Sequence, residues 1–103
     1  MNSITQYVKD KNGNKVGVLA ALKVHGRIVI AGAKAHRSAG DRFDKQTGFN
    51  IAMDRIVKTI DCGRKNRIAA SMENDLNQFS DRCVRYFKTR QENILRPEVI
   101  PFR

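Results

Sequence analysis

The apolar residues of this chain repeat with two different periods, and the change between them constrains the fold. From Lys15 to Val24 apolar side chains occupy alternate positions, as in a strand half buried under helices. From Phe49 to Ile60 they recur every three or four residues, as in an amphipathic helix. The strand set is Val16, Val18, Ala20, Leu22 and Val24, and the helix set is Phe49, Ala52, Met53, Ile56, Val57 and Ile60.

Turn signals divide the first third of the chain into hairpins. Ile4–Lys9 reads as a short strand and is followed by Asn12-Gly13, a strong hairpin signal because both residues tolerate positive φ. His25-Gly26 marks a second tight turn, after which Arg27–Ala35 returns as another strand. The pattern predicts a β-meander.

Two helices are predicted after the meander. Asp41 or Asp44 can cap the start of the first, and Gly63 can end it. The second begins near Ser71 and carries a seam of apolar residues at spacings of three and four. Such a seam fits one helix of a helix-paired dimer, or a helix that packs on the chain's own sheet. Its residues are Met72, Leu76, Phe79, Cys83 and Tyr86, predicted here as an oligomer interface.

The architecture that follows is α+β, a three- or four-stranded antiparallel sheet with two helices packed on one face. A chain of 103 residues forms a single domain, residues 1–103. We expect the sheet in 1–40, the helices in 41–96 and an extended tail in 97–103, because Pro97 and Pro101 end the last helix. Gly17 and Gly32, inside strands, predict bulges or close backbone approach.

Charge is the main indication of a partner. Lysine and arginine number 20 against 10 acidic residues, which gives a net charge of +10 and a pI of about 10.2. This balance favours phosphate-bearing partners, namely nucleotides, nucleic acid or an anionic membrane surface. The alternative is a soluble protein that happens to be basic.

Other function classes find little support. Cys62 and Cys83 are the only cysteines, and neither a secretory leader nor a membrane span is visible, so we expect a cytoplasmic protein without membrane association. No metal-ligand spacing is present, and no metal or cofactor is expected. His36 has no partner carboxylate at a recognisable spacing, so we expect no enzymatic activity.

The loop before the first helix is the first candidate anion site. Small residues there let a phosphate approach the backbone N–H groups of a helix N-terminus, and arginines can clamp it. A capped, solvated loop is the alternative, because Asp41 and Asp44 compete for the same helix end. The candidate residues are His36, Arg37, Ser38 and Arg42.

Further candidates come from the second half of the chain. Arg64 and Arg67 belong to a basic link between the helices, which also reads as a solvated turn. On the last helix, Tyr86 can stack on a base, and Arg90 belongs to a basic ridge beside the seam.

The segment from Asp41 to Arg55 resembles small bacteriophage accessory proteins, in particular the Thoeris anti-defence family of the first described type. The resemblance covers roughly residues 15–55 and rests on Asp41-x-Phe43-x-Lys45-x-x-Gly48-x-x-Ile51-Ala52-x-x-Arg55. It implies an antiparallel sheet followed by two helices, assembled as dimers or hexamers. It also implies a cytosolic sponge that sequesters cyclic ADP-ribose isomers. No binding residue of the family is carried over to this chain.

The leading hypothesis is therefore a non-enzymatic phage anti-defence protein that sequesters an anionic, cyclic nucleotide signal in pockets between subunits. It would act as a homodimer or higher homo-oligomer in the cytoplasm of an infected bacterium. The alternative is a basic nucleic-acid-binding protein, or an anti-CRISPR-like inhibitor of a host nucleic-acid complex. A third possibility is a protein that docks on an acidic partner.

Overall fold

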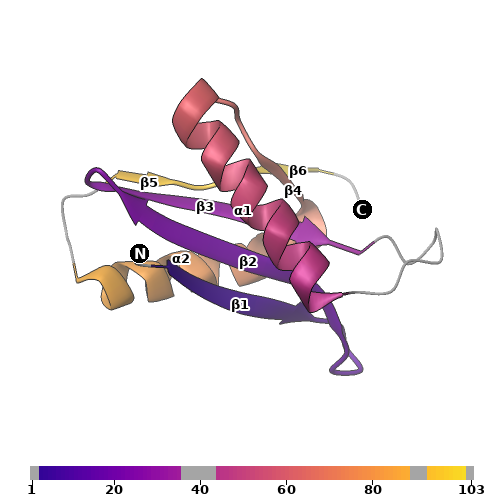
Figure 1. Cartoon of the computed structure of the whole chain (residues 1–103). Helices are drawn as coiled ribbons and strands as arrows, with labels where there is room; N and C mark the ends of the chain where they lie inside the picture. The colour runs from indigo at the N-terminus through magenta and orange to yellow at the C-terminus, as the bar shows by residue number, and fades with distance from the viewer. Residues whose placement is uncertain (1–2, 36–43, 89–92, 102–103) are drawn as a thin grey trace.

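A central sheet lies between the two helices of this chain (Figure 1). The computed structural model describes residues 3–35, 44–88 and 93–101. The elements are β1 (Ser3–Lys9), β2 (Lys15–Val24), β3 (Arg27–Lys34), α1 (Lys45–Cys62), β4 (Arg67–Ala69), a 3₁₀ turn (Ala70–Met72), α2 (Glu73–Phe87), β5 (Asn93–Leu95) and β6 (Glu98–Ile100).

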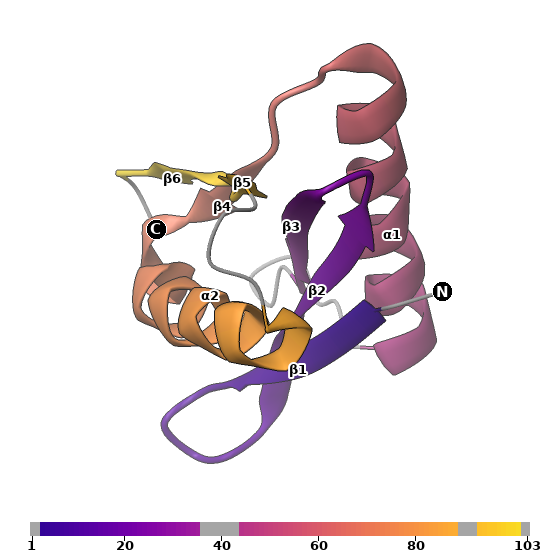
Figure 2. The same ribbon diagram turned by 90° about the vertical axis from the view of Figure 1, so that its left-hand side faces the viewer.

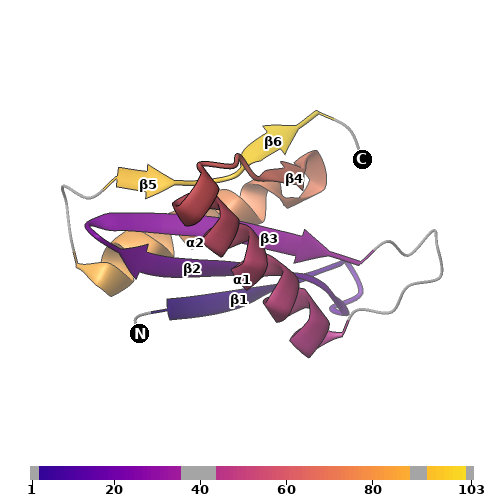
Figure 3. The ribbon, with the colours of Figure 1, turned by 45° about the horizontal axis from the view of Figure 1, so that its top comes forward.

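The predicted α+β class is confirmed, with an N-terminal meander followed by two helices. Strands β1, β2 and β3 pair antiparallel in that order. β5 then pairs parallel to the start of β3, which completes a four-stranded sheet in the order β1-β2-β3-β5. A separate parallel pair, β4 and β6, lies beyond the β3 edge (Figure 3). Only the meander is therefore antiparallel.

The end of the chain differs from its prediction. Helix α2 ends at Phe87, with Lys88 as a left-handed cap at a φ of 52°, rather than continuing toward residue 96. Where helix and then tail were expected, the chain forms β5 and β6, which pair with β3 and β4. Ile94 and Val99 pack against the core from these strands. Burial of those two side chains gives the short strands a physical reason to dock.

The prediction that both helices pack on one face is wrong, because they lie on opposite faces of the sheet (Figure 2). On the α2 face, Leu19 and Ile30 join the core of that helix. On the α1 face, Ala20 and Ala31 belong to the core that packs against α1. Since successive strand residues point to opposite faces, two apolar neighbours in β2 and in β3 bury both faces. The alternating residues of β2 mark one buried face of the strand and give no sign that the other face is buried too.

A bulge changes the direction of one residue in the predicted strand set. The pairing of β1 with β2 shifts between Val8 and Lys9, so Val16 lies in the α2 core while Val18 lies in the α1 core. Glycine beside the bulge has the expected close approach, because a Cβ on Gly17 would lie 2.9 Å from the Ala33 carbonyl oxygen. A Cβ on Gly32 would lie 3.2 Å from the Val18 carbonyl oxygen. Both predictions for these glycines are confirmed.

The ends of α1 follow the sequence signals. The Asp44 carboxylate accepts hydrogen bonds from the Thr47 backbone N–H and, at 2.5 Å, from its hydroxyl. These bonds hold the pKa of the Asp44 carboxyl below its ordinary value. Gly63 ends the helix in the left-handed region at a φ of 66°. Asp41, the other predicted cap, lies outside the described residues.

The apolar seam of α2 packs into the chain's own core. Met72, Leu76, Phe79 and Cys83 are at most 2% exposed in the single chain. A side chain buried by its own sheet offers no surface to a second copy, so the structure corrects the interface prediction for these four. The fifth, Tyr86, is 53% exposed.

Candidate anion-binding site

A basic pocket forms where the chain passes from α1 into β4. Its volume is about 630 Å³, and it opens to solvent. Residues of α1 form one wall, and the link that leads into β4 forms the other. The lining residues are Ile51, Asp54, Arg55, Lys58, Arg64, Lys65, Asn66 and Arg67.

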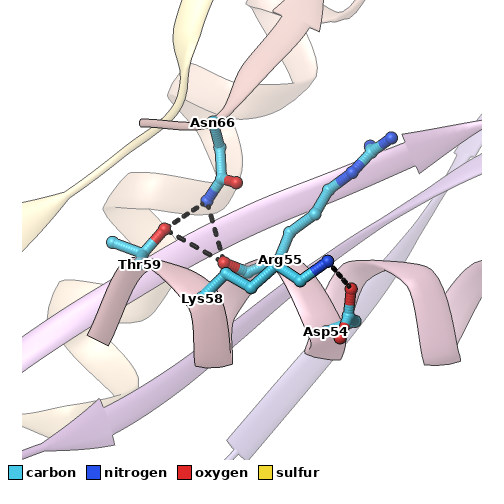
Figure 4. Close-up of polar contacts among 5 residues, drawn as sticks. All are labelled: Asp54, Arg55, Lys58, Thr59 and Asn66. Carbon is cyan, nitrogen blue, oxygen red and sulfur yellow. Dashed lines mark hydrogen bonds and ion pairs between the residues drawn. The ribbon is translucent and has the colours of Figure 1, made fainter. Parts of the chain in front are cut away.

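Polar contacts fix the shape of the link over the end of α1 (Figure 4). The Asn66 side-chain amide donates to the Thr59 hydroxyl at 2.8 Å, and that hydroxyl lies 3.0 Å from the Arg55 carbonyl and 2.8 Å from the Arg64 carbonyl. The Asn66 carbonyl accepts from the Glu98 N–H at 2.9 Å, which ties the link to β6. The link is thus held in one conformation by side chains from both of its ends.

Arg55 connects the pocket to the sheet. Its guanidinium Nη1 donates to the Gly32 carbonyl oxygen of β3, and the side chain extends away from α1 toward the strands (Figure 4). This hydrogen bond uses one of the five guanidinium N–H donors of the side chain. The arginine is therefore held by the sheet, and among the described residues no other contact of its guanidinium is seen.

Positive charge exceeds negative charge in the pocket. Lys58 pairs with Asp54 at 3.1 Å, whereas Lys65 and Arg67 share Glu98 at 3.8 and 3.6 Å. Two cations on one carboxylate at such distances are weakly neutralised.

Arg64 adds a further positive charge to this pocket. Among the described residues, its guanidinium has no hydrogen-bond or ion-pair partner. Five cationic side chains line the pocket against one carboxylate.

This arrangement suits a phosphate group. Guanidinium groups bind phosphate oxygens through paired, charge-assisted hydrogen bonds, and lysines add point charges. No aromatic side chain occurs among the described lining residues, and Ile51 is their one apolar member. The pocket therefore offers its contacts to phosphate rather than to a stacked base.

The structure brings two predicted binding residues together and separates a third. Arg64 and Arg67 both line the pocket. Tyr86 lies on α2, across the sheet from α1, with its ring 5.0 Å from the ring of Phe87 in an edge-on arrangement. The remaining candidates lie outside the described residues, namely His36, Arg37, Ser38, Arg42 and Arg90.

Sequence reasoning did not select Arg55 or Lys58 as ligand residues. Together with Ile51 they occupy positions i, i+4 and i+7 of α1, on a flank outside the buried stripe. That spacing was a usable signal, because it places two cations on one side of a helix next to an exposed apolar residue. Their meeting with the link depends on the tertiary fold.

Three further findings complete the description. Within residues 3–35, 44–88 and 93–101, no helix is long and apolar enough to cross a membrane. No group of three or more potential metal-ligating side chains occurs in those same ranges. Comparison with protein families, with curated proteins and with solved structures finds no match.

Proposed function

We propose that this protein is a non-enzymatic binding protein that holds a phosphate-bearing nucleotide in the pocket between α1 and β4. The observation that carries the proposal is the excess of positive charge there: five cationic side chains line a volume of about 630 Å³, against Asp54 in the lining and Glu98 beside two of the cations. A volume of this size falls in the usual range for small-molecule sites.

The energetics support a phosphate ligand. A hydrogen bond to a charged group contributes about 1.5–3 kcal/mol, so about three to five such bonds reach the roughly 8 kcal/mol of micromolar binding. Arg55 is already positioned by the Gly32 carbonyl, and Asn66 and Thr59 already hold the link. Little ordering entropy is then lost on binding, which favours affinity.

The resemblance to Thoeris anti-defence proteins supplies a biological setting for the proposal. In that setting the protein sequesters a cyclic nucleotide signal in the cytoplasm of a phage-infected bacterium, and it needs no catalytic group. The pocket is lined by a single chain. In the proposal, one copy of the chain therefore supplies the phosphate contacts.

A second candidate function is binding to the backbone of a nucleic acid. The lack of aromatic side chains among the described lining residues favours it, as does the net charge of +10. For such binding, the logarithm of the binding constant falls linearly with the logarithm of the salt concentration. The slope is roughly −0.7 to −0.9 for each phosphate neutralised. Length-dependent binding with a steep salt slope would select this candidate over the first.

The test begins with the ligand that the protein carries. Protein purified from bacteria is heat-denatured, and the released supernatant is analysed by mass spectrometry. A discrete nucleotide supports the proposal, and heterogeneous nucleic acid supports the second candidate.

Calorimetry with the identified nucleotide, or with ADP as a probe, then compares two exposed arginines. Arg64→Met should weaken binding roughly tenfold, because one charge-assisted contact is lost. Arg85→Met on α2 makes the same charge change away from the pocket and should leave binding within about twofold. Equal losses in both variants would mean that only overall charge matters, and the pocket would then not be the site.

A further inference from the structure

A second cluster of positive charge lies at the start of α1, around the ring of Tyr7. The Lys15 ammonium lies 4.7 Å from the ring centroid, and the Lys45 ammonium lies 5.6 Å from it. Lys15 begins β2 and Lys45 begins α1, so these two side chains come from distant parts of the sequence. Figure 1 shows this end of α1 beside the start of β2.

Lys9 brings a third ammonium to the same place. It is the cross-strand partner of Lys15 in the β1–β2 pairing, next to the bulge. Like charges directly opposite each other on neighbouring strands are destabilising. Within the part of the chain that the structure describes, neither Lys15 nor Lys45 forms an ion pair with a carboxylate.

We propose that Lys9, Lys15 and Lys45 form a second phosphate-binding site beside Tyr7, separate from the pocket between α1 and β4. A phosphate group between the ammonium groups converts their mutual repulsion into attraction, since its oxygens accept hydrogen bonds from several donors at once. The tyrosine ring supports the lysine side chains through cation–π contact.

The titration of Lys15 supports this geometry. Several effects lower the pKa of the Lys15 ammonium. The largest is side-chain hydrogen-bond contact with Lys45, followed by desolvation and by repulsion from Lys45 and Lys9. The positive charge of Lys15 is therefore disfavoured in this cluster, and a bound anion would relieve that cost.

The ligand chemistry is a phosphoester or diphosphate group, carried by a free nucleotide or by a nucleic-acid backbone. The α1–β4 pocket and this cluster draw on different residues, and each can be removed without the other. The second site therefore stands or falls independently of the proposed function.

The experiment uses thermal unfolding of the full chain in low salt, with and without inorganic pyrophosphate. The Lys15→Met/Lys45→Met variant keeps the aliphatic stems that pack near Tyr7 and removes two charges. We expect it to melt above the wild type without ligand and to gain less from pyrophosphate. The control, Lys11→Met/Lys88→Met, changes the net charge equally at exposed positions outside the cluster and should respond to pyrophosphate as the wild type does.

Calorimetry with two probes then distinguishes the sources of phosphate. If the Lys15→Met/Lys45→Met variant loses affinity roughly tenfold for pyrophosphate but not for an oligonucleotide, the site binds a small phosphate ligand. A loss that extends to a single-stranded oligonucleotide assigns it to a nucleic-acid backbone. Equal stabilisation by pyrophosphate in the wild type and the double variant, with unchanged affinity for both probes, would overturn the proposal.

Discussion

The two faces of the sheet are packed in different ways. On the α2 face the core contains large side chains, among them Phe79, Leu76 and Leu19, all fully buried. On the α1 face alanines such as Ala20, Ala31 and Ala52 lie among larger residues such as Val18, Val29 and Ile56, and the backbone of α1 comes closer to the strands than that of α2. One helix is thus spaced from the sheet by bulky side chains, and the other approaches it closely.

This difference in helix packing affects where a ligand site can form. Because α1 lies close to the sheet, Arg55 on its flank reaches the Gly32 carbonyl of β3 and helps form the pocket wall. On the α2 side Arg82 reaches the opposite edge, where it donates to the Thr5 carbonyl at 3.2 Å and to the Gln6 side chain at 3.1 Å. The link beside α1, which leads into β4, adds Arg64, Lys65 and Arg67 to the pocket wall.

The largest expected effect is a truncation on the bulky face. Phe79→Ala removes a fully buried ring and should lower the free energy of unfolding by about 3–5 kcal/mol, because a cavity remains. Urea denaturation measures it. Tyr86→Ala, on the same helix but half exposed, is the control and should change stability by less than about 1 kcal/mol. Similar losses in both would mean that α2 is not packed as described.

An enlargement on the close face should have the next largest effect. Ala52→Leu adds three carbons where α1 approaches the strands, and overpacking should cost about 1–3 kcal/mol of unfolding free energy. Asn50→Leu, at an exposed position on the same helix, serves as the control and should be close to neutral. If Ala52→Leu were as stable as the wild type, α1 would not lie as close to the sheet as this account requires.

The two cysteines give a smaller contrast between buried and exposed positions. Burial raises the pKa of the Cys83 thiol to about 12, whereas Cys62 is exposed at the end of α1. Since the thiolate is the reactive form, we expect one thiol per chain to react promptly with a disulfide reagent at neutral pH and the second only after unfolding. Two prompt reactions in the native protein would contradict the burial of Cys83.

The meander and the ends of α1 could be predicted from sequence because their signals are local. Asn12-Gly13 and the alternation in β2 fix the hairpin, and Asp44 and Gly63 mark the helix ends. The alternating set marks only one buried face of β2, so the pattern does not predict that the helices lie on opposite faces. The short strands β5 and β6 carry three residues each, and their pairing with distant strands leaves no periodic signal.

The candidate site shows the same division between local and tertiary information. The sequence predicts Arg64 and Arg67 as binding residues because both lie in one short basic link. Arg55 and Lys58 join them because α1 and the link fold toward each other, and that approach depends on the Thr59 and Asn66 contacts. Local sequence therefore predicts two of the five cationic residues of the pocket, and the fold adds the rest.

The central claim is that the pocket between α1 and β4 binds phosphate, and an NMR titration of isotope-labelled protein with ADP tests it most directly. We expect the backbone amides of Arg55, Lys58 and the link residues Arg64 to Arg67 to shift in a saturable, concentration-dependent way. It also predicts that Arg64→Met weakens this titration while Arg85→Met does not. If those amides did not move at an ADP concentration that saturates binding, the pocket would not be the binding site.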